Sequence, residues 1–356
     1  MNKITVGILG ATGSVGQRFI ELLSNHPYFE VAELGASGRS AGKKYSEAVN
    51  WIMQTPLPTE YGNLVVKECI PNFNSKIIFS GLDASVAGEI ETQFAESGYF
   101  VISNARNHRF DIDVPLIIPE INYDHLELLH VQKYKGGIIT NPNCSTIGLA
   151  MALKPLYDNF GLEAVNVVTM QAISGAGYPG VASLDILDNV IPYIGGEEEK
   201  LETEPTKILG KLHLSKTDSD KTNTGEIELT NFKISAQCNR VPVIDGHTES
   251  VQVKLKSKPT LEEIKKVWRE FKSLPQKLNL PSAPIKPIHY YEEDNYPQAK
   301  IHRNLENGMG VAIGRLRECA LFDYKFTILS HNTIRGAAGG TILIAELMQA
   351  KGYFTK

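Results

Sequence analysis

Cys144 stands where a nucleophilic cysteine would be expected. It follows the apolar run Gly137–Thr140 and an Asn-Pro-Asn turn at residues 141–143, and Ser145 and Thr146 then begin a segment that we predict to be a helix. A helix N-terminus favours a thiolate, which is the reactive form of cysteine. The alternative is an ordinary buried cysteine, the usual state of this residue type. We predict that Cys144 is a nucleophile.

The four cysteines, at positions 69, 144, 238 and 319, share no spacing that would indicate a metal site or a disulfide framework. Four cysteines in 356 residues are also too few for a chain held together by disulfides. We therefore predict no metal site.

The segment Arg240–His247, with the sequence RVPVIDGH, is a second candidate for chemistry. Its proline and its Asp-Gly pair predict a turn-rich loop between strands. Taken alone, a histidine in such a loop is as often simply exposed. Together with an activated cysteine elsewhere in the chain, His247 becomes a candidate acid/base.

A glycine-rich turn at residues 10–16, GATGSVG, follows a predicted strand and opens a predicted helix. The GxxGxxG spacing is a variant of the dinucleotide-binding fingerprint, in which glycines let the backbone approach a pyrophosphate at the helix N-terminus. The alternative is a plain tight turn between a strand and a helix. The surrounding strand and helix favour nucleotide binding.

The residues after the second predicted strand favour NADP over NAD. An NAD enzyme usually has an acid there to hold the ribose 2′-hydroxyl. This chain has Ser37 at about that place, followed by Arg39 and Ser40. Hydroxyls and a guanidinium suit a 2′-phosphate.

The first half of the chain alternates predicted strands and helices, which indicates a parallel sheet built from βαβ units. The strands are expected at Lys3–Leu9, Val31–Ala36, Ile77–Ser80, Phe100–Ser103 and Gly137–Thr140, and the helices at Val15–Leu23, Val86–Glu96 and Asp124–Tyr134.

The second half has longer strand-like runs with few helices, which predicts an α+β domain on a mixed or antiparallel sheet. The strands are expected at Ala164–Ile173, Asn231–Asn239, Glu249–Lys256, Gly310–Arg317 and Asp323–Leu329, and the helices near Lys200–Leu212, at Thr260–Lys272 and at Thr333–Lys351. The polar segment Ser215–Thr224 is expected to be a mobile surface loop. We expect residues 1–147 with 332–356 to form a dinucleotide-binding domain, and residues 148–331 a catalytic domain.

The composition is that of a globular protein with no nucleic-acid partner. Lysine and arginine number 36 against 40 acidic residues, and 42% of the residues are hydrophobic. A nucleic-acid-binding domain would usually be basic. No apolar run reaches the ~20 residues that cross a bilayer. We expect a cytoplasmic protein that does not enter a membrane.

Six motifs occur in an order that resembles one family. They are GATGSVG at 10–16, NPNCS at 141–145, QAISGAG at 171–177, Glu197-x-x-Lys200, Arg240-x6-His247 and HNTIRGAAGG at 331–340. Together they resemble aspartate-β-semialdehyde dehydrogenases of the archaeal and fungal branch. The resemblance spans almost the whole chain.

The resemblance implies an NADP-dependent enzyme with a Rossmann-like domain and a second, α+β domain for catalysis and dimerisation on a mixed sheet. It implies a homodimer or homotetramer that reduces β-aspartyl phosphate reversibly to aspartate β-semialdehyde through a cysteine thioester. This reaction belongs to the biosynthesis of lysine, threonine, methionine and isoleucine.

The resemblance also implies residue roles. Cys144 corresponds to the nucleophile, His247 to the acid/base and Gln171 to a residue that orients the acyl group. The implied substrate-binding residues are Arg240 for the α-carboxylate, Glu197 for the amine, and Arg109, Asn143 and Lys200 for the phosphate. The implied NADP-binding residues are Gly10, Thr12, Gly13, Ser14, Val15, Ser37, Arg39, Ser40, Ser80, Gly175 and Asn332.

Two kinds of alternative remain open. A malonyl-CoA reductase, or the acyl-phosphate reductase of arginine biosynthesis, is expected to use the same fold. A catalytically silent NADP-binding regulator belongs to a different class. The Glu197-x-x-Lys200 pair favours a small aminated acyl phosphate, and the presence of Cys144, Arg240 and His247 together favours an enzyme.

Overall fold

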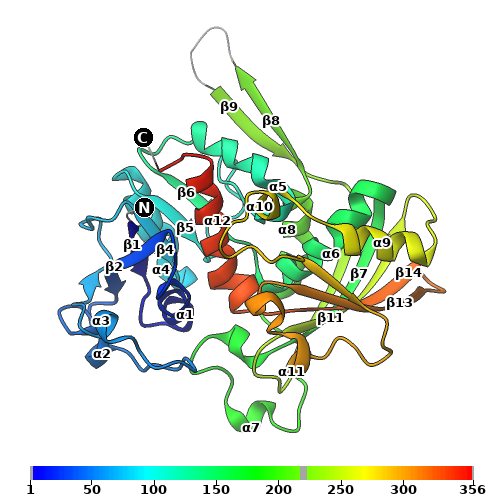
Figure 1. The fold of residues 1–356 in the computed structure, drawn as a ribbon, viewed down its shortest axis with the longest axis horizontal. Coiled ribbons are helices and arrows are strands. Elements are labelled where there is room, and N and C mark those ends of the chain that lie inside the picture. The colour runs from blue at the N-terminus through cyan, green and yellow to red at the C-terminus, as the bar shows by residue number, and fades with distance from the viewer. Residues whose placement is uncertain (1–2, 217–222, 355–356) are drawn as a thin grey trace.

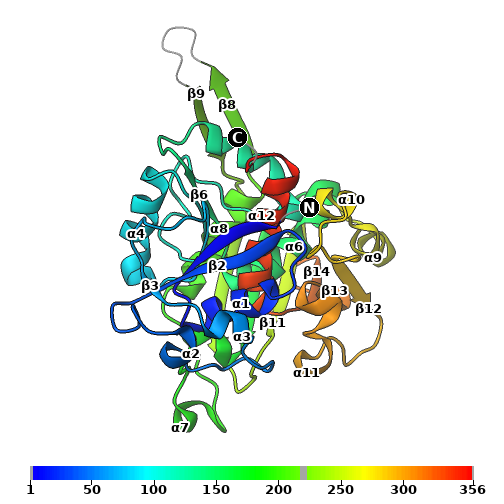
Figure 2. The same ribbon diagram turned by 60° about the vertical axis from the view of Figure 1, so that its left-hand side comes forward.

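The computed structural model describes residues 3–216 and 223–354. These residues form two six-stranded sheets covered by helices, and a two-stranded ribbon that projects from one end of the molecule (Figure 1). A view turned by 60° shows helix α12 (Gly339–Ala350) between the two sheets (Figure 2). The predicted combination of a parallel sheet and a mixed sheet is confirmed.

All strands of the first sheet run parallel, in the order β3-β2-β1-β4-β5-β6. All of them except the edge strand β3 consist mostly of buried residues, as expected for a sheet with helices on both faces. The strands are β1 (Ile4–Leu9), β2 (Phe29–Ala36), β3 (Lys67–Glu68), β4 (Ile77–Ser80), β5 (Phe100–Ser103) and β6 (Gly137–Thr140). Their carboxyl ends lie at one edge, where an open α/β sheet binds its ligands.

Helices α1 (Ser14–Leu23), α4 (Ala84–Glu96) and α12 accompany the first sheet. Phe19 and Ile20 of α1 and Ile342 and Leu343 of α12 belong to the same hydrophobic core as strands β1 and β4. The last helix of the chain therefore completes the core of the first sheet.

The second sheet has the order β10-β7-β11-β14-β13-β12 and mixes parallel and antiparallel neighbours. Its strands are β7 (Leu162–Gln171), β10 (Lys233–Arg240), β11 (His247–Leu255), β12 (Ile288–Tyr291), β13 (Val311–Glu318) and β14 (Tyr324–Ser330). One face packs against the long helix α6 (Cys144–Phe160), whose residues 147, 149–153 and 156 are buried in the core of this sheet. Helices α8 (Glu197–Ile208) and α9 (Leu261–Glu270) pack beside α6.

Short elements join these parts. They are helices α2 (Tyr45–Ala48), α3 (Thr59–Gly62), α5 (Pro119–Asn122), α7 (Ser183–Ile186), α10 (Leu274–Lys277) and α11 (Ala299–His302), and the 3-10 helices Ile173–Ala176 and Leu305–Gly308. Within the described ranges, no helix is both long and apolar enough to span a membrane.

The predicted helix at Asp124–Tyr134 is wrong in type and length. The chain forms a 3-10 helix over Tyr123–His130 and then turns. The side chain of Gln132 bonds to the backbone N–H and carbonyl of Ile138, at 2.9 and 2.8 Å. These two bonds hold Gln132 beside β6, so the helix does not continue.

The segment around residues 208–224 also differs from expectation. Helix α8 ends at Ile208 instead of reaching Leu212, and Leu212 pairs with Ile227 in an antiparallel ribbon of β8 (Lys211–Lys216) and β9 (Asn223–Glu228). Part of the expected loop is therefore strand. Its remainder, residues 217–222, lies outside the described residues.

The predicted helix at Thr333–Lys351 has two parts, a π-helix at Ile334–Ala338 followed by α12. The N–H of Gly336 bonds to the carbonyl of His331, five residues earlier. A Cβ on Gly336 would lie 2.7 Å from Cβ of Cys144. The glycine thus allows the wide turn to pack directly on the cysteine.

Candidate active site

The Asn-Pro-Asn turn places Cys144 as the first residue of α6. Asn143 is the N-cap, and its side-chain oxygen accepts hydrogen bonds from the N–H groups of Ser145 and Thr146, at 2.9 and 3.3 Å. The N–H of Asn141 bonds to the carbonyl of Ser103 at the end of β5. The first sheet and the helix cap together fix the position of the cysteine.

His247, the first residue of β11, meets this cysteine from the second sheet. Its Nε2 lies 3.2 Å from Sγ of Cys144. Its Nδ1 accepts a hydrogen bond from the N–H of Ala172 at 3.0 Å. Because Nδ1 is an acceptor, the proton of a neutral imidazole sits on Nε2, facing the sulfur.

Burial keeps both partners neutral in the free protein. Burial, with the nearby Glu197 carboxylate, raises the pKa of Cys144 to about 12, although Lys200 and Arg240 act in the opposite direction. Burial, with the charge of Arg240, lowers the pKa of His247 to about 3. The expectation that the helix N-terminus yields a thiolate is therefore not met in the free protein, because desolvation dominates.

Arg240 and Gln171 end two neighbouring strands, and the pairing register puts them opposite each other. One guanidinium nitrogen of Arg240 donates to the carbonyl of Ala172 at 2.7 Å. A Cβ on Gly175 would lie 2.8 Å from this guanidinium and 3.1 Å from the ring of His247. A larger residue than Gly175 would push these two side chains from their places.

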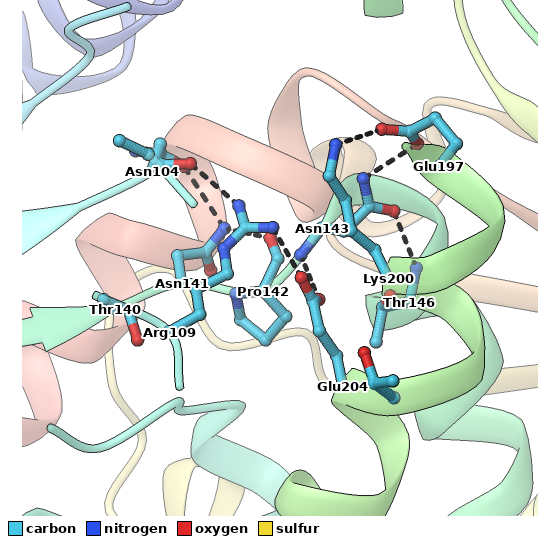
Figure 3. A network of polar contacts seen from close by, with 12 residues as sticks. Asn104, Arg109, Thr140, Asn141, Pro142, Asn143, Thr146, Glu197, Lys200 and Glu204 are labelled. Atoms are coloured by element: carbon cyan, nitrogen blue, oxygen red, sulfur yellow. Dashed lines mark hydrogen bonds and ion pairs between the residues drawn. The ribbon is translucent and has the colours of Figure 1, made fainter. Parts of the chain in front are cut away.

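Glu197, at the start of α8, accepts hydrogen bonds from three side chains, of which Figure 3 shows Lys200 and Asn143. Lys200 Nζ donates to it at 2.6 Å, Asn143 Nδ2 at 2.8 Å and Gln171 Nε2 at 3.3 Å. Burial alone would raise the pKa of Glu197, but Lys200 and these hydrogen bonds outweigh it and lower the pKa. Glu197 is therefore ionised and holds Lys200 beside the cap of α6.

Arg109 approaches the same turn from the first domain (Figure 3). It donates to Glu204 Oε1 at 2.7 Å and to the carbonyl of Asn104 at 2.8 Å. The second oxygen of Glu204 accepts the backbone N–H of Asn143 at 2.7 Å. Glu204 was not predicted from the sequence. Its position four residues after Lys200 and seven after Glu197, on one face of a helix, is the signal that would have found it.

A cavity of about 410 Å³ opens at Cys144, between the two domains. Nine of the predicted site residues line it: Ser14, Val15, Arg109, Asn143, Cys144, Gly175, Glu197, Lys200 and Asn332. Gln171, Arg240 and His247 are buried next to this wall rather than part of it. The side chain of Asn332 is bound to the N–H of Gly246 and to Ser174 Oγ.

The remaining predicted cofactor residues lie along the carboxyl edge of the first sheet. Gly10 has a φ of 72°, and a Cβ there would lie 2.5 Å from the carbonyl oxygen of Gly81, so the turn that includes Thr12 and Gly13 requires glycine at its start. Ser37 and Arg39 are exposed beyond the end of β2, where the N–H of Ser40 bonds to the carbonyl of Ser37. Ser80 ends β4, and its hydroxyl donates to the buried Glu91.

Two family descriptions match the chain. "Semialdehyde dehydrogenase, NAD binding domain" matches residues 5–129, and "Semialdehyde dehydrogenase, dimerisation domain" matches residues 153–335. The first range covers the parallel sheet except β6 and the first residue of β1, and the second range covers every strand of the mixed sheet.

The relatives that match over nearly their whole length are named aspartate-semialdehyde dehydrogenase. The aspartate-semialdehyde dehydrogenase of Schizosaccharomyces pombe is 50% identical over 98% of both chains, and that of Methanothermobacter thermautotrophicus is 47% identical over 97% of this chain and 99% of its own. The crystal structure of aspartate semialdehyde dehydrogenase with NADP from Candida albicans has a TM-score of 0.89 and 46% identity over 99% of both chains. Aspartate semialdehyde dehydrogenase II from Vibrio cholerae, complexed with ASA, has a TM-score of 0.76 and 26% identity over 99% of this chain and 100% of its own. With a cysteine and a histidine in contact at a cleft next to a glycine-rich turn, and with these relatives, the chain belongs to the aspartate-semialdehyde dehydrogenase family.

Proposed function

We propose that this chain catalyses the reversible NADP-dependent reduction of β-aspartyl phosphate to aspartate β-semialdehyde and phosphate, in the biosynthesis of the aspartate family of amino acids. The observation that carries the proposal is the 3.2 Å contact between Cys144 Sγ and His247 Nε2 at a cavity also lined by Arg109 and Lys200. A nucleophile, a proton donor and two cations at one cavity are the groups that this acyl transfer requires.

The residues present fit a dinucleotide. A Cβ on Gly10 would lie 2.5 Å from the carbonyl oxygen of Gly81, and one on Gly16 would lie 2.3 Å from the carbonyl oxygen of Gly10, so this tight turn needs glycine at both positions. Ser14 and Val15 lie within this turn and share the cavity wall with Cys144. Ser37, Arg39 and Ser40 would hold the 2′-phosphate. When bound, NADPH supplies the hydride that reduces the Cys144 thioester.

The side chains of this protein would carry out the remaining steps. Sγ of Cys144 bonds to the acyl carbon as the bond from that carbon to the phosphate oxygen breaks. The departing phosphate takes the thiol proton, and Arg109 and Lys200 meet its remaining charge. Arg240 holds the α-carboxylate, for which a planar guanidinium is better suited than an ammonium group. His247 gives a proton through Nε2 to the substrate oxygen and takes it back when the thiohemiacetal collapses.

Glu197 would hold the substrate amine and Gln171 would orient the acyl group, as the resemblance implies. Glu197 is ionised and lies at the cavity wall, which supports its role with an ammonium group. Asn143 would contribute to the phosphate site from the N-cap of α6.

The match to a dimerisation domain supports a homo-oligomer. The choice between homodimer and homotetramer stays a prediction, as does a cytoplasmic location. We also propose residues 1–147 with 332–356 as the dinucleotide-binding domain and 148–331 as the second domain, because α12 lies in the core of the first sheet.

Initial rates separate this function from a malonyl-CoA reductase or a silent regulator. We expect NADP to be reduced with aspartate semialdehyde in a reaction that depends on phosphate, and we expect no oxidation of NADPH with malonyl-CoA.

Cys144→Ser should abolish turnover and still bind NADP, because the glycine turn does not depend on the thiol. Cys319→Ser, at a half-buried position in the connection between β13 and β14, is the matched control and should keep full activity. Full activity of Cys144→Ser, or faster turnover of malonyl-CoA, would overturn the proposal.

A further inference from the structure

Helix α8 presents three charged side chains to the turn that precedes the nucleophile. Glu197, Lys200 and Glu204 are spaced by three and four residues, so they lie on one face of the helix. The resemblance assigns roles to the first two. Glu204 is 1% exposed and more deeply buried than either of them. A carboxylate at that depth needs partners that compensate for its lost hydration.

The partners of Glu204 come from two separate segments of the chain. Oε1 accepts a hydrogen bond from Arg109 Nη1, and Oε2 accepts one from the backbone N–H of Asn143, both at 2.7 Å. Figure 3 shows the carboxylate between these two groups. Bonds of this length to an ionised acceptor are among the stronger hydrogen bonds in proteins. Glu204 therefore joins the guanidinium of the first domain to the residue next to Cys144.

The geometry points to Glu204 as a positioning residue for the phosphate side of the reaction, which fixes Arg109 relative to Cys144 Sγ. This inference rests on the proposed function, because it assigns Arg109 to the phosphate. Arg109 is otherwise held through the carbonyl of Asn104, and its Nε is buried without a partner among the described residues. Without Glu204, one of the two anchors of the guanidinium is lost.

The same carboxylate also fixes the turn. Asn143 is held by α8 at two points, its N–H by Glu204 and its side-chain amide by Glu197. Its side-chain oxygen at the same time caps the helix that begins with Cys144. Loss of Glu204 would let the nucleophile and the phosphate-binding cation move independently of each other, and misplacement of about 1 Å is enough to lower a rate markedly.

A positioning role and a purely electrostatic role of Glu204 predict opposite changes in the KM for phosphate, so kinetics can distinguish them. A carboxylate beside Arg109 reduces the positive potential that attracts phosphate, so its charge alone weakens phosphate binding. If Glu204 acted only through charge, removing it would lower the KM for phosphate. If it positions Arg109, removing it raises that KM and lowers kcat.

Two substitutions separate these cases. Glu204→Gln keeps the size, but its amide NH2 must face the N–H of either Arg109 or Asn143, so one bond becomes a contact between two donors. Glu204→Asp keeps the charge but is one methylene too short to reach both partners. We expect both variants to lower kcat about tenfold and to raise the KM for phosphate about tenfold, with the KM for semialdehyde within about twofold of wild type.

Glu199→Gln is the matched control, because Glu199 is exposed on the same helix. Glu199→Gln should leave kcat, the KM for phosphate and the KM for semialdehyde unchanged. Thermal unfolding of each variant shows whether it is folded at the assay temperature, since loss of one partner of a buried ion pair is destabilising. Glu204→Asp retains that charge and is the variant to rely on if Glu204→Gln does not fold.

The inference is overturned if Glu204→Asp has wild-type constants, if Glu204→Gln lowers the KM for phosphate, or if the KM values for phosphate and semialdehyde rise equally. Wild-type turnover that depends on phosphate is measured first. Its absence would count against the proposed function and not against Glu204.

A second readout needs no turnover. Inorganic phosphate should protect wild-type Cys144 from iodoacetamide, and half-protection of Glu204→Gln should require about tenfold more phosphate. Equal protection of both proteins would overturn the positioning role by itself.

Discussion

The backbone N–H of Ala172 donates to Nδ1 of His247 at 3.0 Å and thereby decides which nitrogen of the ring faces Cys144 with a proton. The carbonyl of the same residue accepts a hydrogen bond from Arg240 at 2.7 Å. A thiolate–imidazolium pair would need a proton on Nδ1, pointing at another N–H. The fold therefore presents the neutral histidine as a donor to the sulfur, and the resting pair is a thiol and an imidazole.

The first prediction concerns the reactivity of this thiol. Because burial raises the pKa of Cys144 to about 12, the thiolate fraction at neutral pH is small and rises with pH. We expect the rate of alkylation by iodoacetamide to rise about tenfold per unit between about pH 7 and pH 9. The rate is measured by mass spectrometry, with Cys144→Ser as the control for the other cysteines. A plateau below pH 8 would indicate a preformed ion pair and contradict the prediction.

The second prediction separates the roles of Arg240 and Lys200 in substrate binding. Arg240→Lys keeps the charge but loses the planar fork, so we expect a lower kcat and a higher KM for semialdehyde, together costing on the order of 1.5–3 kcal/mol in kcat/KM. Lys200→Ala removes a point charge and should chiefly raise the KM for phosphate. Steady-state kinetics that vary each substrate separately test both. Wild-type constants in either variant would refute the role assigned to that residue.

The third prediction concerns cofactor choice. Arg39 is exposed beyond the end of β2, close in sequence to Ser37 and Ser40. Loss of a charge-assisted contact to a 2′-phosphate costs on the order of 1.5–3 kcal/mol, so Arg39→Ala should lower the preference for NADP over NAD by about ten- to a hundredfold. The measurement is kcat/KM with each cofactor. If substitutions at all three positions left the preference for NADP over NAD unchanged, the 2′-phosphate would be bound by another segment.

The fourth prediction concerns Glu249, which lies two residues after His247 on the buried face of β11. Both of its carboxyl oxygens are buried without a partner among the described residues, and burial raises its pKa well above the usual range. The folded state then holds a proton that the unfolded chain has lost, so its contribution to stability falls as pH rises above about 4.5, by up to ~1.4 kcal/mol per unit. Glu249→Gln removes this titration and keeps the shape.

We therefore expect Glu249→Gln to be more stable than wild type, by a margin that grows between about pH 5 and pH 8. Denaturant unfolding at fixed protein concentration measures it, with Glu199→Gln as an exposed control. A stability difference that does not change with pH would show that Glu249 is ionised in the fold.

Local patterns were enough to predict much of the framework. The strands at Ile77–Ser80, Phe100–Ser103 and Gly137–Thr140 have the predicted bounds, because each is a short apolar run between clear breaks. The glycine turn and the helix after Cys144 follow from nearest-neighbour chemistry in the same way.

What depends on distant partners was not predictable from such patterns. Cys144 stays protonated because it is buried where it contacts a histidine 103 residues away in the sequence. The π-helix follows from the packing of Gly336 on the same cysteine, and the role of Glu204 becomes visible only when Arg109 is placed beside it. In each case, a contact between segments that are far apart in the sequence changes or extends the structure that the local sequence favours.

Helix α12 has a consequence for how the chain acquires its structure on the ribosome. The core of the first sheet includes Ile342, Leu343 and Met348, although every strand of that sheet lies before residue 141. About two hundred residues must be translated between the last of these strands and the helix that covers them. The nascent N-terminal sheet, which α1 covers only in part, therefore keeps exposed apolar surface until α12 has been translated.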